Sequence, residues 1–361
     1  MASKDKNRKD YGLNVDFNSF GLRPAGSYLD ELKKLNSLLD TSKTVSDDFK
    51  VTMDEADEAA QKLLKEMGGG NVLTPSAPKT AAEESPERPN LDELLAELDS
   101  LVGLDKIKQN VRSLINLAKV RKLREEQGLP TPAMSLHLVF MGNPGTGKTT
   151  VARLISQLYY AIGVLSKGQL VEVDRSKLVA GFVGQTAIKT DEAIKKAMGG
   201  VLFIDEAYSL TSVEGSNDFG HEAVETVLKA MEDHRDDLVV IVAGYEELME
   251  RFISSNPGLE SRFNRYFVFE DYNGEELFRI FESMAKKNRY VLDDEAAEFL
   301  KNHFNMLYDT RDENFGNARD VRNVFENVVS VHSDRVAQLE ELGTEDLITV
   351  KREDVEKAAE M

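Results

Sequence analysis

The sequence predicts an α/β fold, in which a parallel β-sheet is covered by helices on both faces, followed by a small helical domain. From Asn90 onward, short apolar runs typical of strands alternate with stretches of helical periodicity, and this alternation builds parallel sheets. After Tyr272 the strand-like runs stop and helical stretches follow. A glycine-rich motif, GNPGTGKT at residues 142–149, stands between a strand-like run and a helical one.

The predicted elements follow one another in a regular order. A helical region over residues 91–120 opens the α/β domain, and its strands are expected at residues 136–141, 169–173, 201–205, 238–244 and 266–272. A last helix follows the run LITV, and the other helices of the second domain are expected near residues 274–288, 293–308 and 317–340. These patterns predict an α/β domain over residues 91–272 and a helical domain over residues 273–361.

The first 90 residues differ from the rest in composition. Residues 68–90 contain three consecutive glycines and four of the nine prolines, which predicts a flexible linker. Residues 1–67 are expected to form a small helical or partly disordered region, because two short amphipathic patterns cover residues 27–40 and 54–67. A loosely folded tail and a docking element for a partner explain these patterns equally well.

Composition excludes several classes of function. The chain has no cysteine, so disulfides, thiolate metal sites and cysteine nucleophiles are excluded, and its five histidines lack metal-ligand spacing. The net charge of −19 disfavours nucleic acid as a partner, because duplex binding needs a basic surface. The charged N-terminus lacks an apolar signal core, and no apolar run is long enough to span a membrane. These observations predict a cytoplasmic protein.

The motif at residues 142–149 matches the phosphate-binding loop G-x-x-x-x-G-K-[ST] in full. Its glycines let backbone N–H groups surround a phosphate at the N-terminus of the following helix. Lys148 is expected to reach the β- and γ-phosphates of ATP, and the Thr149 hydroxyl to bind Mg²⁺. A glycine-rich turn that binds nothing is the alternative, and the flanking strand and helix argue against it. The predicted nucleotide-binding residues are Asn143, Pro144, Gly145, Thr146, Gly147, Lys148, Thr149 and Thr150.

A second motif, VLFIDEA at residues 201–207, ends an apolar strand with two carboxylates. Such a pair is costly at the end of a buried strand unless it meets a cation. Asp205 is placed to hold Mg²⁺, directly or through water, and Glu206 to polarise the attacking water. The two motifs together predict an enzyme that hydrolyses ATP to ADP and phosphate, with ATP and Mg²⁺ as cofactors.

Three later motifs accompany these two. They are LVGLDKIK at residues 101–108, GLESRFNRYFVFEDY at 258–272 and GNARDVRN at 316–323. Together the five motifs resemble those of the AAA+ ATPases, and in particular the branch that includes the red-type Rubisco activase and the stage V sporulation protein K. Further marks of that branch are VLSKGQLVEVDR, GFVGQTAIKT, VAGYEELM and NPGLESRF. The resemblance extends over about residues 91–340 and implies an AAA+ P-loop domain followed by a helical lid domain.

The resemblance implies roles for residues outside the phosphate loop. The backbone near Val102 and Gly103 is expected to surround adenine, and Arg319 stands at the sensor-2 position. The superfamily usually has Asn or Thr at the sensor-1 position, where this chain has Tyr245, whose hydroxyl could substitute.

Arg262 and Arg265 stand where the superfamily carries arginine fingers. An inserted guanidinium accelerates phosphoryl transfer by roughly 10³–10⁵-fold, and these arginines are far in sequence from Lys148. If they serve a neighbouring subunit, contacts are head-to-tail and the subunits close into a ring. The resemblance implies a homo-oligomer of six subunits. Surface arginines in solvated ion pairs are the alternative.

Phe182 stands between two glycines, Gly181 and Gly184, in the run GFVGQT. In a ring this loop would face the central channel, where Phe182, Val183 and Gly184 could grip a threaded polypeptide. The alternative is that Phe182 packs on its own domain. Residues 211–222 form a weaker candidate for a second channel loop.

The sequence therefore favours an Mg-ATP-dependent, ring-forming ATPase that remodels a protein client. One alternative is a metabolic activator that acts on Rubisco and senses a sugar bisphosphate. The other is an ATPase directed at nucleic acid, such as a clamp loader, which the net charge disfavours.

Overall fold

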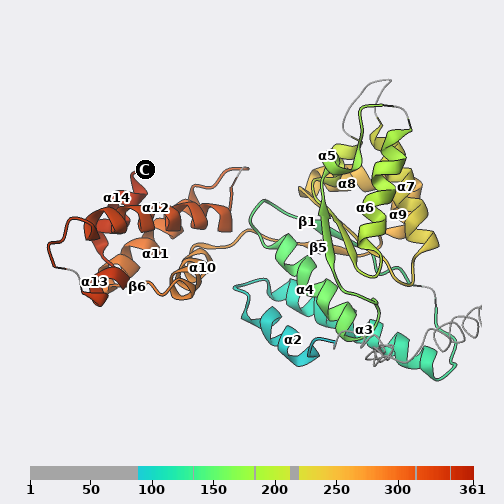
Figure 1. The fold of residues 1–361 in the computed structure, drawn as a ribbon, viewed down its shortest axis with the longest axis horizontal. Helices are drawn as coiled ribbons and strands as arrows, with labels where there is room; N and C mark the ends of the chain where they lie inside the picture. The colour runs from blue at the N-terminus through green and yellow to red at the C-terminus, as the bar shows by residue number, and fades with distance from the viewer. Residues whose placement is uncertain (1–87, 133, 183, 212–218, 314, 342) are drawn as a thin grey trace, which may run out of the picture. The chain divides into compact units, whose positions relative to one another are not determined.

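A computed structural model of the chain describes residues 88–361, apart from residues 133, 183, 212–218, 314 and 342. The predicted helical region over residues 1–67 and nearly all of the predicted linker over 68–90 lie outside the described residues. Element labels below follow Figure 1.

A five-stranded parallel sheet forms the centre of the α/β domain (Figure 1), as predicted. Its strands lie in the order β2-β3-β4-β1-β5. All residues of β1, β3 and β4 are buried, as expected for strands covered on both faces. The strands are β1 (Leu138–Met141), β2 (Leu170–Val173), β3 (Val201–Ile204), β4 (Val239–Gly244) and β5 (Tyr266–Val268).

Helices cover both faces of this sheet because alternate strand residues point to opposite sides. Leu138 and Phe140 of β1 join the core under α2 (Leu91–Ser100), α3 (Asp105–Glu126) and α4 (Lys148–Ala161). Val139 and Met141 join the opposite core. Its helices are α5 (Arg175–Leu178), α6 (Gln185–Ala197), η2 (Ala207–Leu210), α7 (Gly220–Asp233), α8 (Glu246–Ser254) and α9 (Pro257–Arg262).

The lid domain begins with a well-capped helix and has its own aromatic core. The Asn273 side chain accepts the Glu276 N–H, and the Glu276 side chain accepts the Asn273 N–H, which fixes the start of the first lid helix. Phe281 packs on Phe304 with ring centroids 5.9 Å apart. The lid helices are α10 (Gly274–Lys287), α11 (Asp294–Asp309), α12 (Ala318–Val336), α13 (Thr344–Ile348) and α14 (Arg352–Ala359).

The prediction that strands stop after Tyr272 was wrong. Two short strands of the lid, β6 (Val291–Leu292) and β7 (Thr349–Val350), pair in parallel. Strands of two residues are too short to show an alternating pattern, so the sequence offers no signal for them. This small sheet joins the start of α11 to the segment that precedes α14, because the Asp293 N–H donates to the Val350 oxygen at 3.0 Å.

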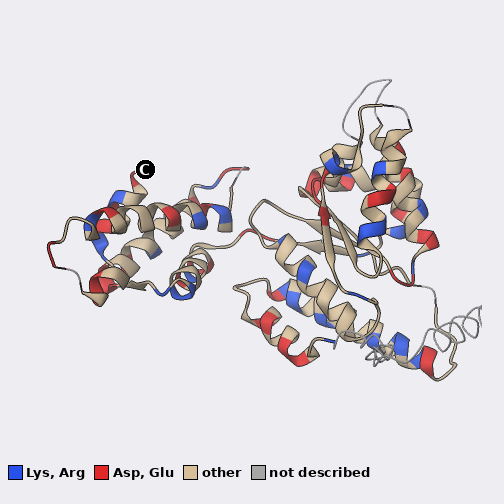
Figure 2. Cartoon of the chain, viewed as in Figure 1, with Lys and Arg blue, Asp and Glu red and all other residues tan. Residues whose placement is uncertain are grey.

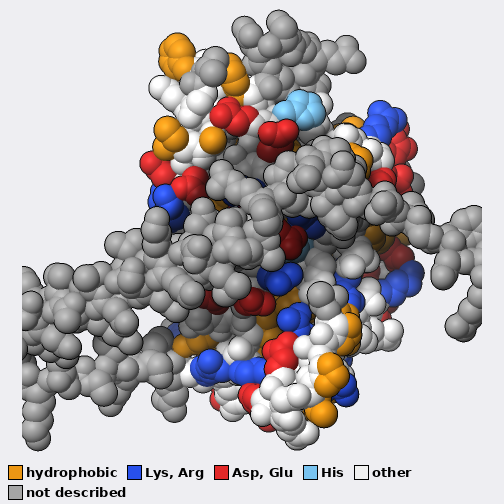
Figure 3. Space-filling view, turned by 90° about the vertical axis from the view of Figure 1, so that its right-hand side faces the viewer, with side chains coloured by type: hydrophobic (Ala, Val, Ile, Leu, Met, Phe, Trp, Pro, Cys, Tyr) orange, Lys and Arg blue, Asp and Glu red, His pale blue; other side chains and the backbone are white. Residues whose placement is uncertain are grey.

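Charges are mixed over the described surface. Figure 2 shows acidic and basic residues interspersed along the helices rather than sorted onto separate faces. On the face drawn in Figure 3, hydrophobic side chains lie in small groups among charged ones. Among the described residues, every helix is too short or too polar to cross a membrane.

Candidate nucleotide-binding site

The phosphate loop connects β1 to α4, as predicted. Gly147 takes a φ of 94° immediately before Lys148, the first residue of α4. A Cβ at Gly145 would lie 2.1 Å from the backbone oxygen of Gly316, so only glycine fits this close approach of the lid to the loop. The buried Thr146 donates from its hydroxyl to the Asn143 oxygen at 2.8 Å, which stabilises the turn.

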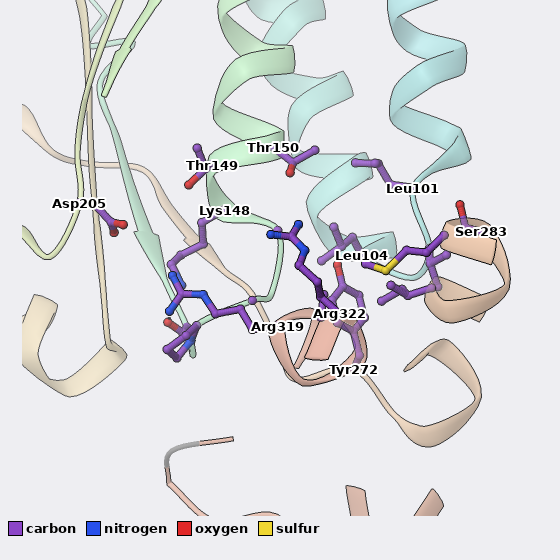
Figure 4. A pocket seen from close by; sticks show the side chains of 18 of the residues that line it. Leu101, Leu104, Lys148, Thr149, Thr150, Asp205, Tyr272, Ser283, Arg319 and Arg322 are labelled. Carbon is purple, nitrogen blue, oxygen red and sulfur yellow. The ribbon is translucent and has the colours of Figure 1, made fainter. Parts of the chain in front are cut away.

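A cavity of about 580 Å³ opens between the phosphate loop, the ends of β3 and β4, and the lid (Figure 4). Most of the predicted site residues line it: Val102, Pro144, Gly145, Gly147, Lys148, Thr149, Thr150, Asp205, Glu206, Tyr245 and Arg319. Gly103, Asn143 and Thr146 are not among its lining residues. Gly103 takes a φ of 59° next to the Glu276 side chain, and the Asn143 amide donates to Asp271 Oδ1 at 3.0 Å.

Lys148, the first residue of α4, holds its ammonium group inside the cavity. Its ammonium donates to the Gly142 and Asn143 oxygens at 2.8 and 2.7 Å. Burial lowers the pKa of Lys148 to about 8, the Asp205 carboxylate opposes that shift, and the Arg319 charge adds to it. A bound phosphate would offset the cost of burying the charged Lys148 ammonium, so the cavity favours the binding of an anion.

Asp205 and Glu206 follow β3 at the same end of the sheet. The Glu206 N–H donates to Asp205 Oδ1 at 3.0 Å, and Glu206 takes a φ of 48°. A residue other than glycine in this conformation carries strain, which is common at catalytic positions. The Thr149 hydroxyl and the Asp205 carboxylate both border the space beside Lys148 (Figure 4). They supply the oxygen ligands that Mg²⁺ prefers, so the residues present fit this ion.

Tyr245 follows β4, which lies between β3 and β1, so its position is next to both the acidic pair and the phosphate loop. Its ring lies 6.3 Å from that of Tyr208. Burial raises the pKa of Tyr208 to about 12, and the nearby Glu206 charge adds to that rise. The Tyr208 phenol therefore stays neutral and able to donate a hydrogen bond at physiological pH.

The apolar end of the cavity was missed by the sequence analysis. It is lined by Leu101, Leu104, Tyr272, Ile280 and Met284, with Ser283 beside them. Tyr272 is buried, and its hydroxyl donates to the Thr146 oxygen at 3.2 Å, which ties this end to the phosphate loop. Apolar and aromatic surface of this kind suits a nucleobase.

Arg322 was also missed. It lies one turn after Arg319 on α12, and both side chains point into the cavity (Figure 4). Arg319 lies beside Lys148, whereas Arg322 lies nearer Thr150, Leu104 and Tyr272. The spacing of three residues within GNARDVRN was the signal that could have identified it.

Arg262 and Arg265 do not line this cavity. Arg262 pairs with Glu232 at 3.3 Å and donates to the Gly258 oxygen at 3.4 Å. The Nε atom of Arg265 is buried without a hydrogen-bond partner among the described residues. The structure thus keeps both arginines out of the nucleotide cavity of their own chain.

Phe182 lies on the loop between α5 and α6, with 72% of its surface exposed. The alternative that it packs on its own domain is therefore wrong. Gly184 ends the loop with a φ of 76°, and a Cβ at Gly181 would meet open space. Val183 and most of the second candidate loop lie outside the described residues.

A phosphate loop, an acidic strand end and a helical lid that line one cavity define a P-loop ATPase domain. Residues 138–271 match the ATPase family associated with various cellular activities (AAA), and residues 273–361 match the AAA lid domain. The chain is 42% identical over 266 residues to stage V sporulation protein K of Bacillus subtilis (strain 168), which is 73% of this chain and 82% of that protein.

Two further relatives carry other names. Identity is 44% over 266 residues with the chromosomal protein CbxX of Cupriavidus necator, covering 72% of this chain and 81% of that one. Identity is 41% over 271 residues with the chloroplastic ribulose bisphosphate carboxylase/oxygenase activase of Cyanidioschyzon merolae. That match covers 74% of this chain and 92% of the activase. The chain belongs to the AAA+ ATPases, as the motifs indicate, and is an ATPase.

The solved structures agree on the fold. The crystal structure of the FIGL-1 AAA domain in complex with ADP superposes with a TM-score of 0.52 at 18% identity. It covers 75% of this chain and 92% of that domain. At this identity the likeness concerns the fold alone.

Proposed function

We propose that this chain forms a ring of six subunits that uses Mg-ATP to remodel a protein client in the cytoplasm, with Phe182 gripping the client. The observation that carries the proposal is the 72% exposure of Phe182 on a loop with Gly181 and Gly184. An aromatic ring held in solvent gains free energy when it presses on an extended polypeptide, whatever the sequence of that polypeptide. The loop leads directly into α6, which packs on α7 and on β2 and β3. Since Asp205 directly follows β3, this packing offers a route from the nucleotide to the loop.

The proposed chemistry divides between two subunits. Within one cavity, Lys148 binds the phosphates, Thr149 and Asp205 hold Mg²⁺, and Glu206 orients the attacking water. The Mg²⁺ ion would neutralise charge on the β- and γ-phosphates. Arg262 and Arg265 lie outside their own cavity, which supports action on the nucleotide of the next subunit in a closed ring.

A second candidate function comes from one of the relatives, which is named as an activase of ribulose bisphosphate carboxylase/oxygenase. If this chain acts on such a client, ribulose bisphosphate should stimulate its ATPase activity. Stimulation by DNA and by no protein would instead favour a nucleic-acid-directed ATPase, which the net charge of −19 disfavours.

The test of gripping uses a form that holds ATP without hydrolysing it. Glu206→Gln should retain a labelled unfolded polypeptide, such as casein, when Mg-ATP is present, and should migrate as a closed ring. The double variant Glu206→Gln with Phe182→Ala should form the same ring and release the polypeptide. Equal retention by both forms would remove Phe182 from the proposed function, and a monomer at saturating ATP would remove the ring.

A further inference from the structure

Asn317 is a fully buried residue with a backbone conformation that few residues adopt. Its φ of 52° and ψ of −123° belong to the first central position of a type II′ turn, which glycine normally occupies. The turn is closed by the Arg319 N–H, which donates to the Gly316 oxygen at 2.9 Å. An asparagine held there needs surrounding contacts that outweigh the strain, and such residues cluster at functional sites.

The side chain of Asn317 makes those contacts across the domain boundary. Its Oδ1 accepts the Tyr272 N–H at 2.9 Å, and its Nδ2 donates to Asp271 Oδ1 at 2.8 Å. The same Nδ2 lies 3.3 Å from the Pro144 oxygen and 3.3 Å from the Phe315 oxygen. One amide therefore touches the phosphate loop, the segment that enters the lid, and the start of α12.

Asp271 is the second centre of this network. It accepts the Asn143 amide at 3.0 and 3.2 Å on its two oxygens, and Arg311 lies 3.8 Å away. The Ala318 N–H completes the contact by donating to the Gly145 oxygen at 3.3 Å. The turn of the phosphate loop and the turn that opens α12 are thus joined through both side chains and backbone.

We propose that Asn317 is a positioning residue, which holds Arg319 against the nucleotide phosphates by fixing the start of α12 to the phosphate loop and Asp271. Arg319 stands two residues beyond Asn317 and lies beside Lys148 (Figure 4). Its charge and that of Asp271 both act on Lys148. The inference rests on the proposed function, to which we add the sensor-2 role of Arg319: contact with the γ-phosphate of the ATP bound to its own chain. If the anchor is lost, the lid still packs through its own core, but the approach of Arg319 to the phosphates is no longer fixed.

The variants separate positioning from a merely structural role. Asn317→Gly removes the amide and also relieves the positive φ, so the turn itself is retained. Asn317→Asp keeps the shape and the acceptor for Tyr272 but sets a carboxylate against Asp271. Adding Asp271→Asn restores the hydrogen bond with its direction reversed, because the amide at position 271 then donates to the carboxylate at position 317. Asn288→Gly is the matched control, because Asn288 lies at the exposed end of α10 and donates only locally to the Met284 oxygen.

The measurement is the ratio of the dissociation constants for ADP and for a non-hydrolysable ATP analogue, both with Mg²⁺. Arg319→Ala should lower the preference for the triphosphate. Asn317→Gly should lower it by about tenfold, the factor of one hydrogen bond to a charged group. Asn317→Asp should lower it further, and the double variant with Asp271→Asn should recover it relative to Asn317→Asp. Asn288→Gly should leave it unchanged.

The outcomes distinguish the inference from the function on which it rests. If Arg319→Ala loses the preference while both Asn317 variants keep it and change only Tm, Asn317 is structural and the inference is overturned. If Arg319→Ala keeps the preference, the proposed role of Arg319 fails, and the inference fails with it. No recovery in the double variant would likewise contradict the pairing of Asn317 with Asp271.

Discussion

The guanidinium of Arg262 lies 3.3 Å from the carboxylate of Glu232, at the end of α9. The Ser135 hydroxyl donates to the backbone oxygen of Arg262 at 2.5 Å, so both the backbone and the side chain of this residue have a partner. The side chains of Arg262 and Glu232 are 29% and 59% exposed. An ion pair this open to water contributes at most about 1 kcal/mol, so a phosphate in a neighbouring subunit could replace Glu232 as the partner.

Arg262→Ala should bind ATP normally and hydrolyse it more slowly, by roughly 10³-fold or more if Arg262 is an arginine finger. Glu232→Gln is the matched control: it removes the resting partner of Arg262 and should leave hydrolysis within a few-fold of wild type. Phosphate release and equilibrium ATP titration measure the two effects.

The same variant tests whether the site is shared. Rings that mix Arg262→Ala with Lys148→Ala subunits should recover part of the activity, because an intact arginine then faces an intact cavity. Mixing must be shown independently, for example by subunit exchange between labelled rings. No recovery in rings shown to be mixed would contradict action between subunits.

Lys148 predicts a pH dependence of nucleotide binding. Burial lowers its pKa to about 8 in the free protein, and a bound phosphate favours the charged form. Above that pKa, binding requires proton uptake, so the dissociation constant of ATP should rise by up to about tenfold per pH unit, whereas below it the constant should be flat. Titration with a fluorescent ATP analogue from about pH 6.5 to 9.5 measures this.

Two variants control this profile. Lys148→Ala should abolish binding at every pH. Arg319→Ala should move the upturn to higher pH, because the Arg319 charge lowers the pKa of Lys148. Unchanged affinity in Lys148→Ala would contradict the phosphate-loop assignment itself.

The sequence predicts the phosphate-binding end of the nucleotide cavity but not its apolar end, and the reason is physical. The phosphate loop needs glycines at fixed spacing, and the Mg²⁺ site needs the carboxylates of Asp205 and Glu206 directly after a strand. Both requirements leave a pattern in a short stretch of sequence. Ile280 and Met284 look like any apolar residues on a helix, whether they fill a core or line a cavity. Asn317 contacts Asp271 across 46 positions and Pro144 across 173, so no local pattern marks its network.

His137 predicts a loss of stability in acid. It is buried before β1, its Nδ1 accepts the Val240 N–H at 3.0 Å, and burial lowers its pKa to about 4. In the unfolded chain His137 therefore binds a proton below about pH 6.5, whereas in the folded chain it binds one only below about pH 4. Between these values the free energy of unfolding should fall by up to about 1.4 kcal/mol per pH unit from this residue.

Urea denaturation at several pH values measures that slope. His137→Gln should reduce the slope by up to one proton, since glutamine does not titrate. His234→Gln is the matched control, because it makes the same change at an exposed position. An identical slope in wild type and His137→Gln would show that His137 takes up its proton equally in both states.

Phe182→Ala separates client binding from ATP hydrolysis. Because 72% of the Phe182 surface is already exposed, the truncation removes little packing, and Tm should stay close to that of wild type. The phosphate loop, Asp205 and Glu206 are untouched, so basal ATPase activity should survive within a few-fold. Stimulation by a client should disappear, whereas Phe182→Tyr, which keeps the ring, should behave like wild type.

Met306→Ala is the matched control for losing an exposed hydrophobic side chain, because Met306 is 57% exposed on α11 of the lid. It should keep both basal and client-stimulated activity, which isolates the effect to the loop of Phe182. Thermal unfolding and phosphate release decide the matter together. A truncation at a packed core position would cost about 3–5 kcal/mol and reduce ATPase activity with stability. A stable, ATP-hydrolysing Phe182→Ala that still responds fully to client would mean that the ring of Phe182 grips nothing.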